Sequence, residues 1–307
     1  MVTGTLLKTL RRPGIRLSLL IWRNDIHSPN KNIPEKDFIF SALTCILMLD
    51  LSQGNAINMA ITWLVLAIAI FLRYVLMAAT FYYLFNIRLA ARYQPRQVNL
   101  RPGKNHQIQA EIRFSCFASV LFGLLGTLAI YSWQKGWTFI YTDLSRWRAW
   151  WLLPSLVMVL FIHETYYYWL HRWMHLPGIY RWVHRTHHES LTTSAWTSFS
   201  FHPVESVLQA LPIFILIYIL PLHPVTLIAL FLIMSVTSVI NHLNYEIYPA
   251  ETHRHWLGKW WIGATHHGLH HSRFNYNFGL YFTFWDHWMK TESPDFETVF
   301  EDKTKTG

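Results

Sequence analysis

Cysteine and charged residues are scarce in this sequence. The two cysteines, Cys45 and Cys116, both lie inside apolar runs, which excludes a disulfide framework and a cysteine-rich metal site. Only 14% of the 307 residues are charged, whereas ordinary soluble domains carry about a quarter. Hydrophobic residues make up 52% of the chain, with 16 tryptophans and 15 tyrosines among them. The composition therefore argues against a soluble domain and favours a membrane protein with aromatic residues at the bilayer interfaces.

Apolar runs set the expected fold class. Because a helix needs about 20 apolar residues to cross the hydrocarbon core, the first and fifth runs are marginal and could be tilted, re-entrant or partly interfacial. We predict an all-α, polytopic transmembrane bundle with about four to six membrane segments. The six runs are 38–51, 56–85, 114–133, 149–170, 206–220 and 225–243.

Basic residues are concentrated in the loops between these runs, and this accounts for the net charge of +9. Orientation bias and anionic headgroups explain such a pattern without a nucleic-acid partner, and we predict none. Since positive loops stay on the cytoplasmic side, segments 86–113, 171–205 and 244–307 are expected inside. Segments 134–148 and 221–224 are then expected outside.

Three motifs hold many of the 18 histidines: HRWMH, HRTHH and HGLHH. Residues spaced i, i+3 and i+4 share one face of a helix. Each motif could therefore aim its imidazoles at one point, as metal ligation requires, and neutral imidazole suits Fe, Zn, Cu and Ni. The candidate ligands in the three motifs are His171, His175, His184, His187, His188, His267, His270 and His271.

The order of motifs and apolar runs predicts that the ligands meet on one side of the membrane. HRWMH and HRTHH follow the fourth run, and HGLHH follows the sixth, so two crossings separate them. His242, near the end of the sixth run, can point into the same space and is the ninth candidate ligand. We expect a histidine-rich helical cap at the cytoplasmic face.

Two acidic residues accompany these histidines. Glu164 lies seven residues before His171, and Glu246 lies four residues after His242, so each would share a helical face with its histidine. Metal-bound histidines usually give their second N–H to a carboxylate or carbonyl, so these acids could support ligands or bind metal directly. Two histidines could also line or orient the site: His163 and His202.

The number of imidazoles favours two metal ions. A four-coordinate zinc ion would use only three or four protein ligands. All-nitrogen ligation of two ions beside lipid, without cysteine, suits iron that activates oxygen better than structural zinc.

Two other classes remain open at this point. A metal transporter would place ionisable groups along a path near mid-membrane, whereas these histidines gather at one face. A bis-histidine haem cytochrome needs histidine pairs on facing helices, and a strong Soret band would reveal it.

The ordered boxes resemble those of the fatty acid hydroxylase/sterol desaturase superfamily. The resemblance covers roughly residues 110–290 and is carried by HETYYYWLHRWMH (163–175), HRTHH (184–188), FHPVE (201–205), NHLNYE (241–246) and HHGLHH (266–271). It implies a helical membrane enzyme with a non-haem di-iron centre, held by the motif histidines and His242. It also implies that O2 and external electrons are used to hydroxylate or desaturate a lipid C–H bond. Some members have a further histidine where this chain has Glu246.

The resemblance also divides the chain. We expect a basic interfacial segment at 1–37, a transmembrane hairpin with a basic loop at 38–112, the catalytic domain at 113–290 and a polar C-terminal tail at 291–307. The last residues, EDKTKTG, are expected to be free. No haem-binding cytochrome domain is visible, so electrons are expected from a separate reductase, ferredoxin or cytochrome.

Overall fold

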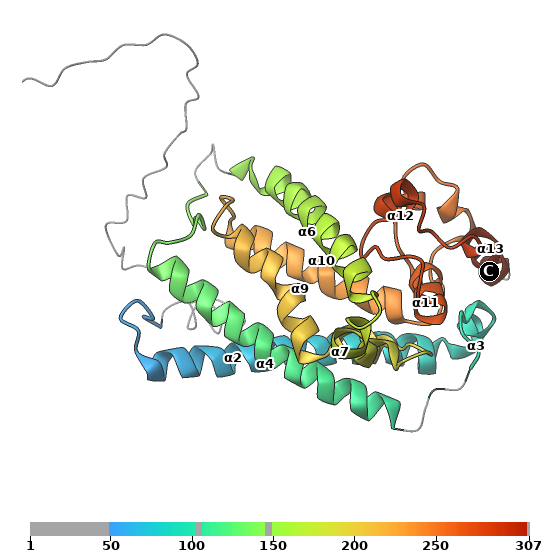
Figure 1. Cartoon of the computed structure of the whole chain (residues 1–307), viewed down its shortest axis with the longest axis horizontal. Coiled ribbons are helices and arrows are strands. Elements are labelled where there is room, and N and C mark those ends of the chain that lie inside the picture. The colour runs from blue at the N-terminus through green and yellow to red at the C-terminus, as the bar shows by residue number, and fades with distance from the viewer. Residues whose placement is uncertain (1–48, 102, 104–105, 145–148, 306–307) are drawn as a thin grey trace, which may run out of the picture. The chain divides into compact units, whose positions relative to one another are not determined.

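The described part of the chain is helical. The computed structural model describes residues 49–101, 103, 106–144 and 149–305, so the predicted segment 1–37 and most of the run 38–51 lie outside the described residues. Within them the only strand-like pairings are two isolated bridges, Gln97–Tyr245 and Trp261–Phe282. The all-α prediction is therefore confirmed (Figure 1).

The elements follow one another as single helices of very different length. The bounds are α2 Ala56–Tyr82, η1 Tyr83–Arg88, α3 Ala90–Tyr93, η2 Gln94–Arg96, α4 Gln107–Gln134, α6 Leu152–Met174, α7 Tyr180–Val183, α8 Arg185–His188, η3 Ala195–Phe199, α9 Pro203–Leu216, α10 Pro224–His242, η4 Ala250–His253, η5 Gly258–Trp260, α11 Ala264–Arg273, α12 Phe284–Met289 and α13 Phe296–Thr304.

Among the described residues, three helical segments are long and apolar enough to cross a membrane: Ala56–Arg88, Gln107–Gln134 and Pro224–His242. The fifth predicted run forms α9, which at 14 residues is too short to span. The fourth run forms α6, whose second half carries glutamate, histidine and arginine and lowers its hydropathy. The protein is thus a polytopic helical membrane protein, with fewer clear spans than the apolar runs suggest.

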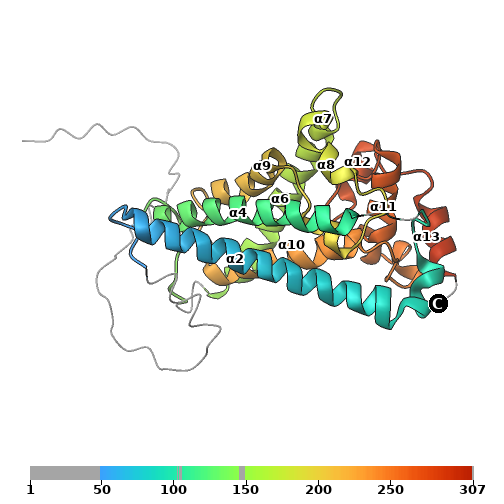
Figure 2. The ribbon, with the colours of Figure 1, turned by 90° about the horizontal axis from the view of Figure 1, so that it is seen from below.

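Helices α2 and α4 lie side by side, as Figure 2 shows from below. They approach closely at Gly123, where an added Cβ would lie 2.8 Å from the Ala67 nitrogen. One turn away, the Thr127 hydroxyl donates to the Gly123 carbonyl at 2.9 Å. Small residues allow such close backbone packing between membrane helices.

Replacing Gly123 by leucine should destabilise this pair by about 1–3 kcal/mol or more, because the added side chain meets backbone atoms that cannot yield. The Gly126→Ala variant is the matched control, since its Cβ meets only the end of the Leu66 side chain at 3.2 Å. Thermal unfolding in detergent should show a large loss for Gly123→Leu and a small one for Gly126→Ala. Equal melting temperatures would contradict this packing.

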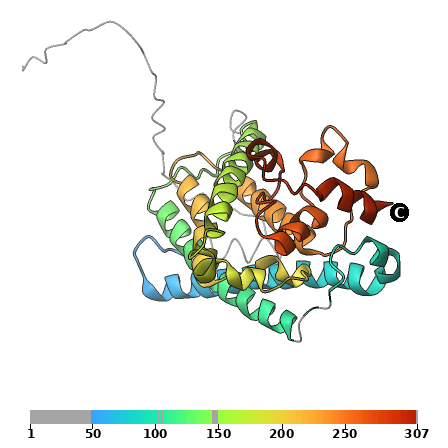
Figure 3. The same cartoon turned by 45° about the vertical axis from the view of Figure 1, so that its right-hand side comes forward.

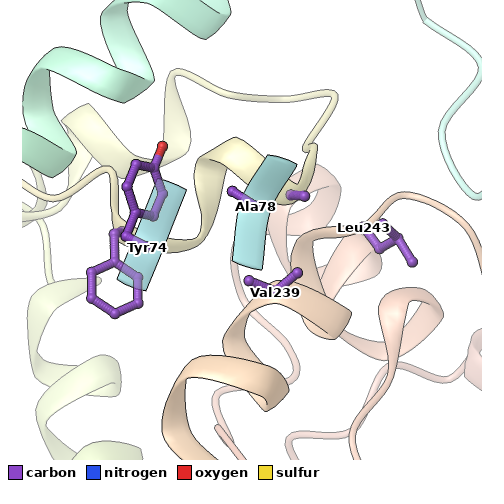
Figure 4. Close-up of a cluster of buried hydrophobic side chains, with 6 residues drawn as sticks. Tyr74, Ala78, Val239 and Leu243 are labelled. Atoms are coloured by element: carbon purple, nitrogen blue, oxygen red, sulfur yellow. The ribbon is translucent and has the colours of Figure 1, made fainter. Parts of the chain in front are cut away.

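A buried apolar cluster joins α2, α10 and η3. Tyr74 and Ala78 from α2 face Val239 and Leu243 at the end of α10 (Figure 4). The Tyr74 hydroxyl also donates to the Trp196 carbonyl at 2.9 Å. This cluster fixes η3, which follows the HRTHH motif, against the bundle.

The C-terminal segment α11–α13 forms a cap beside the end of α10 (Figure 3). Helices α11 and α13 pack on one another. Phe300 and Thr304 of α13 are buried, so the expectation of a free tail from residue 301 is wrong for the described residues through 305. The reason is that one face of α13 packs on the rest of the cap. The polar residues of the segment do not indicate this packing.

Candidate metal centre

The nine predicted ligand residues meet in the cap in two groups. In each group, among the described residues, one ring nitrogen of every member lies within 4.8 Å of the others. The first group combines the end of α6, the α7–α8 segment and α11. The second combines α8, the end of α10 and α11. Their members are His171, His175, His184, His188 and His270 in the first group, and His187, His242, His267 and His271 in the second.

Each HxxHH motif divides between the two groups. His184 and His188 face the first group, while His187 faces the second; in α11, His267 and His271 face the second group and the remaining His270 faces the first. The expectation that each motif aims at one point is therefore wrong for HRTHH and HGLHH, whereas both histidines of HRWMH lie in the first group. With about 3.6 residues per turn, positions i+3 and i+4 differ by about 100° around a helix axis, so one short motif serves two neighbouring centres.

Hydrogen bonds from Nδ1 orient five of the nine rings. In each case the partner is an oxygen that only accepts, so Nδ1 carries the hydrogen and Nε2 of the neutral ring presents a lone pair. The five bonds are His171 to the Phe278 carbonyl at 2.8 Å, His184 to Glu205 Oε1 at 2.8 Å, His187 to the Ser200 carbonyl at 3.2 Å, His242 to the Ser238 carbonyl at 2.7 Å and His270 to the Tyr276 carbonyl at 2.7 Å.

These Nε2 atoms face one another at short distance. The Nε2 atoms of His171 and His184 are 3.0 Å apart, and those of His187 and His242 are 3.1 Å apart. Because both Nδ1 atoms of each pair are already the protonated ones, lone pair faces lone pair, which is repulsive unless a cation lies between them. Metal–nitrogen bonds of about 2.1 Å at right angles separate two ligand atoms by roughly 3 Å. The donor set therefore fits a metal ion in each group.

Burial keeps the imidazoles neutral, the form that binds metals. Desolvation lowers the pKa of His270 to about 4. Desolvation also holds the pKa of His267 well below its usual value, and the neighbouring His242 and His271 add to the effect. At neutral pH, protons therefore do not compete with a metal ion for these ring nitrogens.

Glu205, at the start of α9, is a partner that the sequence reasoning missed. Its Oε1 accepts from His184 Nδ1 at 2.8 Å and from Gln209 Nε2 at 2.9 Å, and it is fully buried. A carboxylate behind a ligand imidazole fixes the ring orientation and raises its basicity. The signal was present in the box FHPVE, but only its histidine was singled out.

Glu164 does not touch a ligand ring; it holds the chain segment that does. Its two oxygens accept from the backbone N–H groups of Leu280 at 2.9 Å and Tyr281 at 2.7 Å. Asp286 accepts in the same way from Phe278 and Gly279, each at 2.9 Å. Burial raises the pKa of Asp286 to about 6. Two buried carboxylates thus fix the Phe278 carbonyl that orients a ligand ring.

Glu246 lies away from the face of His242, contrary to the i+4 expectation. Helix α10 ends at His242, and Asn244 has a left-handed φ of 63°, so the helical spacing no longer holds. The carboxylate accepts from Thr265 N at 2.9 Å and from Tyr248 N at 3.0 Å. It thereby anchors the first turn of α11, the helix that carries the HGLHH motif.

The other two predicted residues have separate places. His202 caps α9, with Nδ1 accepting from Val204 N at 3.3 Å. His163 is buried, and its Nδ1 lies 3.1 Å from the Tyr281 hydroxyl. Neither belongs to the two ligand groups.

A second missed carboxylate, Glu111, is buried near the first turn of α4. Its Oε1 accepts from Gln107, Ser190 and Thr197 at 2.7–2.8 Å. These bonds tie down the loop between HRTHH and η3. Glu111 is the one acid in the basic loop 86–113, a contrast that could have marked it.

The fold and the site define a helical membrane protein with a histidine-rich metal centre in its cap. The fatty acid hydroxylase family model matches residues 156–291, which contain all nine ligand candidates. This part of the chain, less than half of its length, is similar to the fatty acid hydroxylase family.

Individual relatives are sterol enzymes. Delta(7)-sterol 5(6)-desaturase ERG3B of Gibberella zeae is 29% identical over 232 residues, 74% of this chain and 68% of that protein. Human lathosterol oxidase is 30% identical over 184 residues, 59% of this chain and 60% of that protein. The chain thus spans about three fifths to two thirds of the length of these relatives. No solved structure matches the chain.

Proposed function

We propose that this protein is a membrane-bound di-iron oxidoreductase that desaturates or hydroxylates a lipid, with a sterol as its substrate class. The observation that carries the proposal is the pair of all-imidazole groups whose oriented Nε2 atoms face one another at 3.0–3.1 Å. Two iron ions held there would supply an oxidant able to abstract hydrogen from an unactivated C–H bond. The chain's own residues hold the ions, orient the ligand rings and exclude water.

The sterol assignment rests on the relatives, which are named for a 5(6) double bond in Δ7-sterols and for lathosterol oxidation. Desaturation removes two hydrogen atoms from the substrate. Together with two electrons and two protons from a donor, they reduce O2 to two water molecules. Hydroxylation would consume the same O2, electrons and protons but yield one alcohol and one water.

The proposed orientation puts the cap on the cytoplasmic side, where a separate donor protein would supply electrons. Loop 86–113 carries six basic residues against Glu111, which favours that side. A cavity of about 200 Å³ is lined by His175, Arg181 and Phe274. It gives the first group, to which His175 belongs, an opening toward the outside of the protein. A transport role is less favoured because the histidines gather at one end of the helices.

Sterol and lipid profiling tests the function directly. Cells that make a Δ7-sterol but lack its 5(6)-desaturation would express the wild-type chain or the His187→Ala variant. We expect a Δ5,7-sterol, or a hydroxylated lipid, only with the wild type and only in the presence of O2. Identical lipid profiles for the two chains would reject the proposal.

A further inference from the structure

A second group of metal-binding side chains lies on the cap, apart from the nine histidines. His253 of η4 faces Glu297 and Glu301, which stand at i and i+4 on one face of α13. The distances from His253 Nε2 are 3.4 Å to Glu301 Oε1 and 3.7 Å to Glu297 Oε1. Nothing in the lipid chemistry uses these residues.

The imidazole of His253 turns one unpartnered ring nitrogen toward the two carboxylates. Only 7% of its side chain is exposed, and its Nδ1 donates to the Ala250 carbonyl at 2.9 Å. Nε2 has no hydrogen-bond partner among the described residues. In the neutral ring, Nε2 therefore turns a lone pair toward two carboxylate oxygens, an arrangement that a bound cation would relieve.

We propose that His253, Glu297 and Glu301 form a peripheral zinc site. One imidazole nitrogen and two carboxylate oxygens are a common ligand set for Zn²⁺, with water in the fourth position. Ligand atoms 3.4–3.7 Å apart suit tetrahedral bonds of about 2.0–2.2 Å.

Arg254 shares the same carboxylates and acts as the competing cation. Its Nη2 donates to Glu301 Oε1 and lies 3.3 Å from Glu297 Oε1, while 59% of its side chain is exposed. An exposed guanidinium can move into solvent at little cost. Zinc and Arg254 are thus alternatives at one site, and removing the arginine should favour zinc.

The ion would fasten α13 behind the helix that carries ligands of the main centre. The Phe300 ring packs on His253, and the Phe296 ring packs edge-on against His266, the neighbour of ligand His267. Zinc binding at this site would therefore brace α11 from the side opposite the main centre.

Zinc titration of the full-length, iron-loaded protein in nanodiscs tests the site. After dialysis against zinc alone, elemental analysis should find one more zinc ion per chain in the wild type than in the Glu297→Gln/Glu301→Gln variant. Asp302→Asn, an exposed acid on the same helix, is the matched control and should bind zinc as the wild type does. Zinc should also raise the melting temperature of the wild type but not of the double variant.

Arg254→Ala gives a test that does not depend on losing binding. Its zinc affinity should rise by up to about fivefold, the equivalent of one exposed ion pair. Equal zinc content in the wild type and the double variant would overturn the proposal. So would an Arg254→Ala affinity equal to or weaker than that of the wild type, because the cluster would then be an ion-pair network only.

Discussion

Alanine at His187 or at His270 is expected to abolish turnover and the metal loading of the group that loses its ligand. Each substitution removes one ligand nitrogen from a buried group and leaves its neighbours with uncompensated lone pairs. Even the loss of an outer partner of a ligand costs about 10–100-fold in metal affinity or activity, so loss of the ligand itself should exceed a hundredfold. Iron content per chain and product formed per minute would be measured on purified protein in nanodiscs.

The two variants should differ in which ion is lost first. His270 belongs to the first group and His187 to the second, so sub-stoichiometric iron should persist in the opposite group of each variant. His106→Asn is the control, because His106 is exposed and has a left-handed φ of 61° that asparagine tolerates. Full activity in either alanine variant, with normal iron content, would refute the metal-centre assignment.

Helical periodicity predicted that the motif histidines would gather, and the structure brings them together in two groups. The i, i+3, i+4 spacing holds in α11, and α6 and α8 keep their histidines within one turn. Their assignment to two groups was not predictable, since it depends on how α11 is rotated relative to α8. Tertiary packing contributes here: an added Cβ on Gly268 would lie 2.9 Å from Val98 Cγ1, so the missing side chain lets the 97–99 segment lie close to α11.

The supporting oxygens were hidden for a different reason. Four of the five acceptors that orient the rings are backbone carbonyls, for example those of Phe278 and Ser200. Every residue has a backbone carbonyl, so the residue type does not show which of them will accept such a bond. The prediction for Glu246 failed because it assumed that the helix continues beyond His242, where α10 in fact ends. Helix ends and loop paths depend on tertiary contacts that local patterns do not encode.

Glu205→Ala is expected to weaken metal binding in the first group by about 10–100-fold. Without the carboxylate, the His184 Nδ1–H loses its acceptor in a fully buried place, and an unsatisfied buried donor costs about 1–3 kcal/mol. The ring can then rotate or change tautomer, and either change moves Nε2 away from the metal. Chelator competition on the purified protein would give the affinity of each iron ion.

The conservative variant separates orientation from charge. In Glu205→Gln the amide oxygen can still accept from His184 and Gln209, so the ring stays oriented and only the negative charge is lost; the affinity should fall less than in Glu205→Ala. Glu189→Gln is the control, because that carboxylate is about half exposed and pairs only with Arg185 at the surface. A role limited to folding would lower the melting temperature of Glu205→Ala while both ions kept wild-type affinity. Because Glu205 touches only the first group, a selective loss of that one ion is the result that a general loss of packing could not produce.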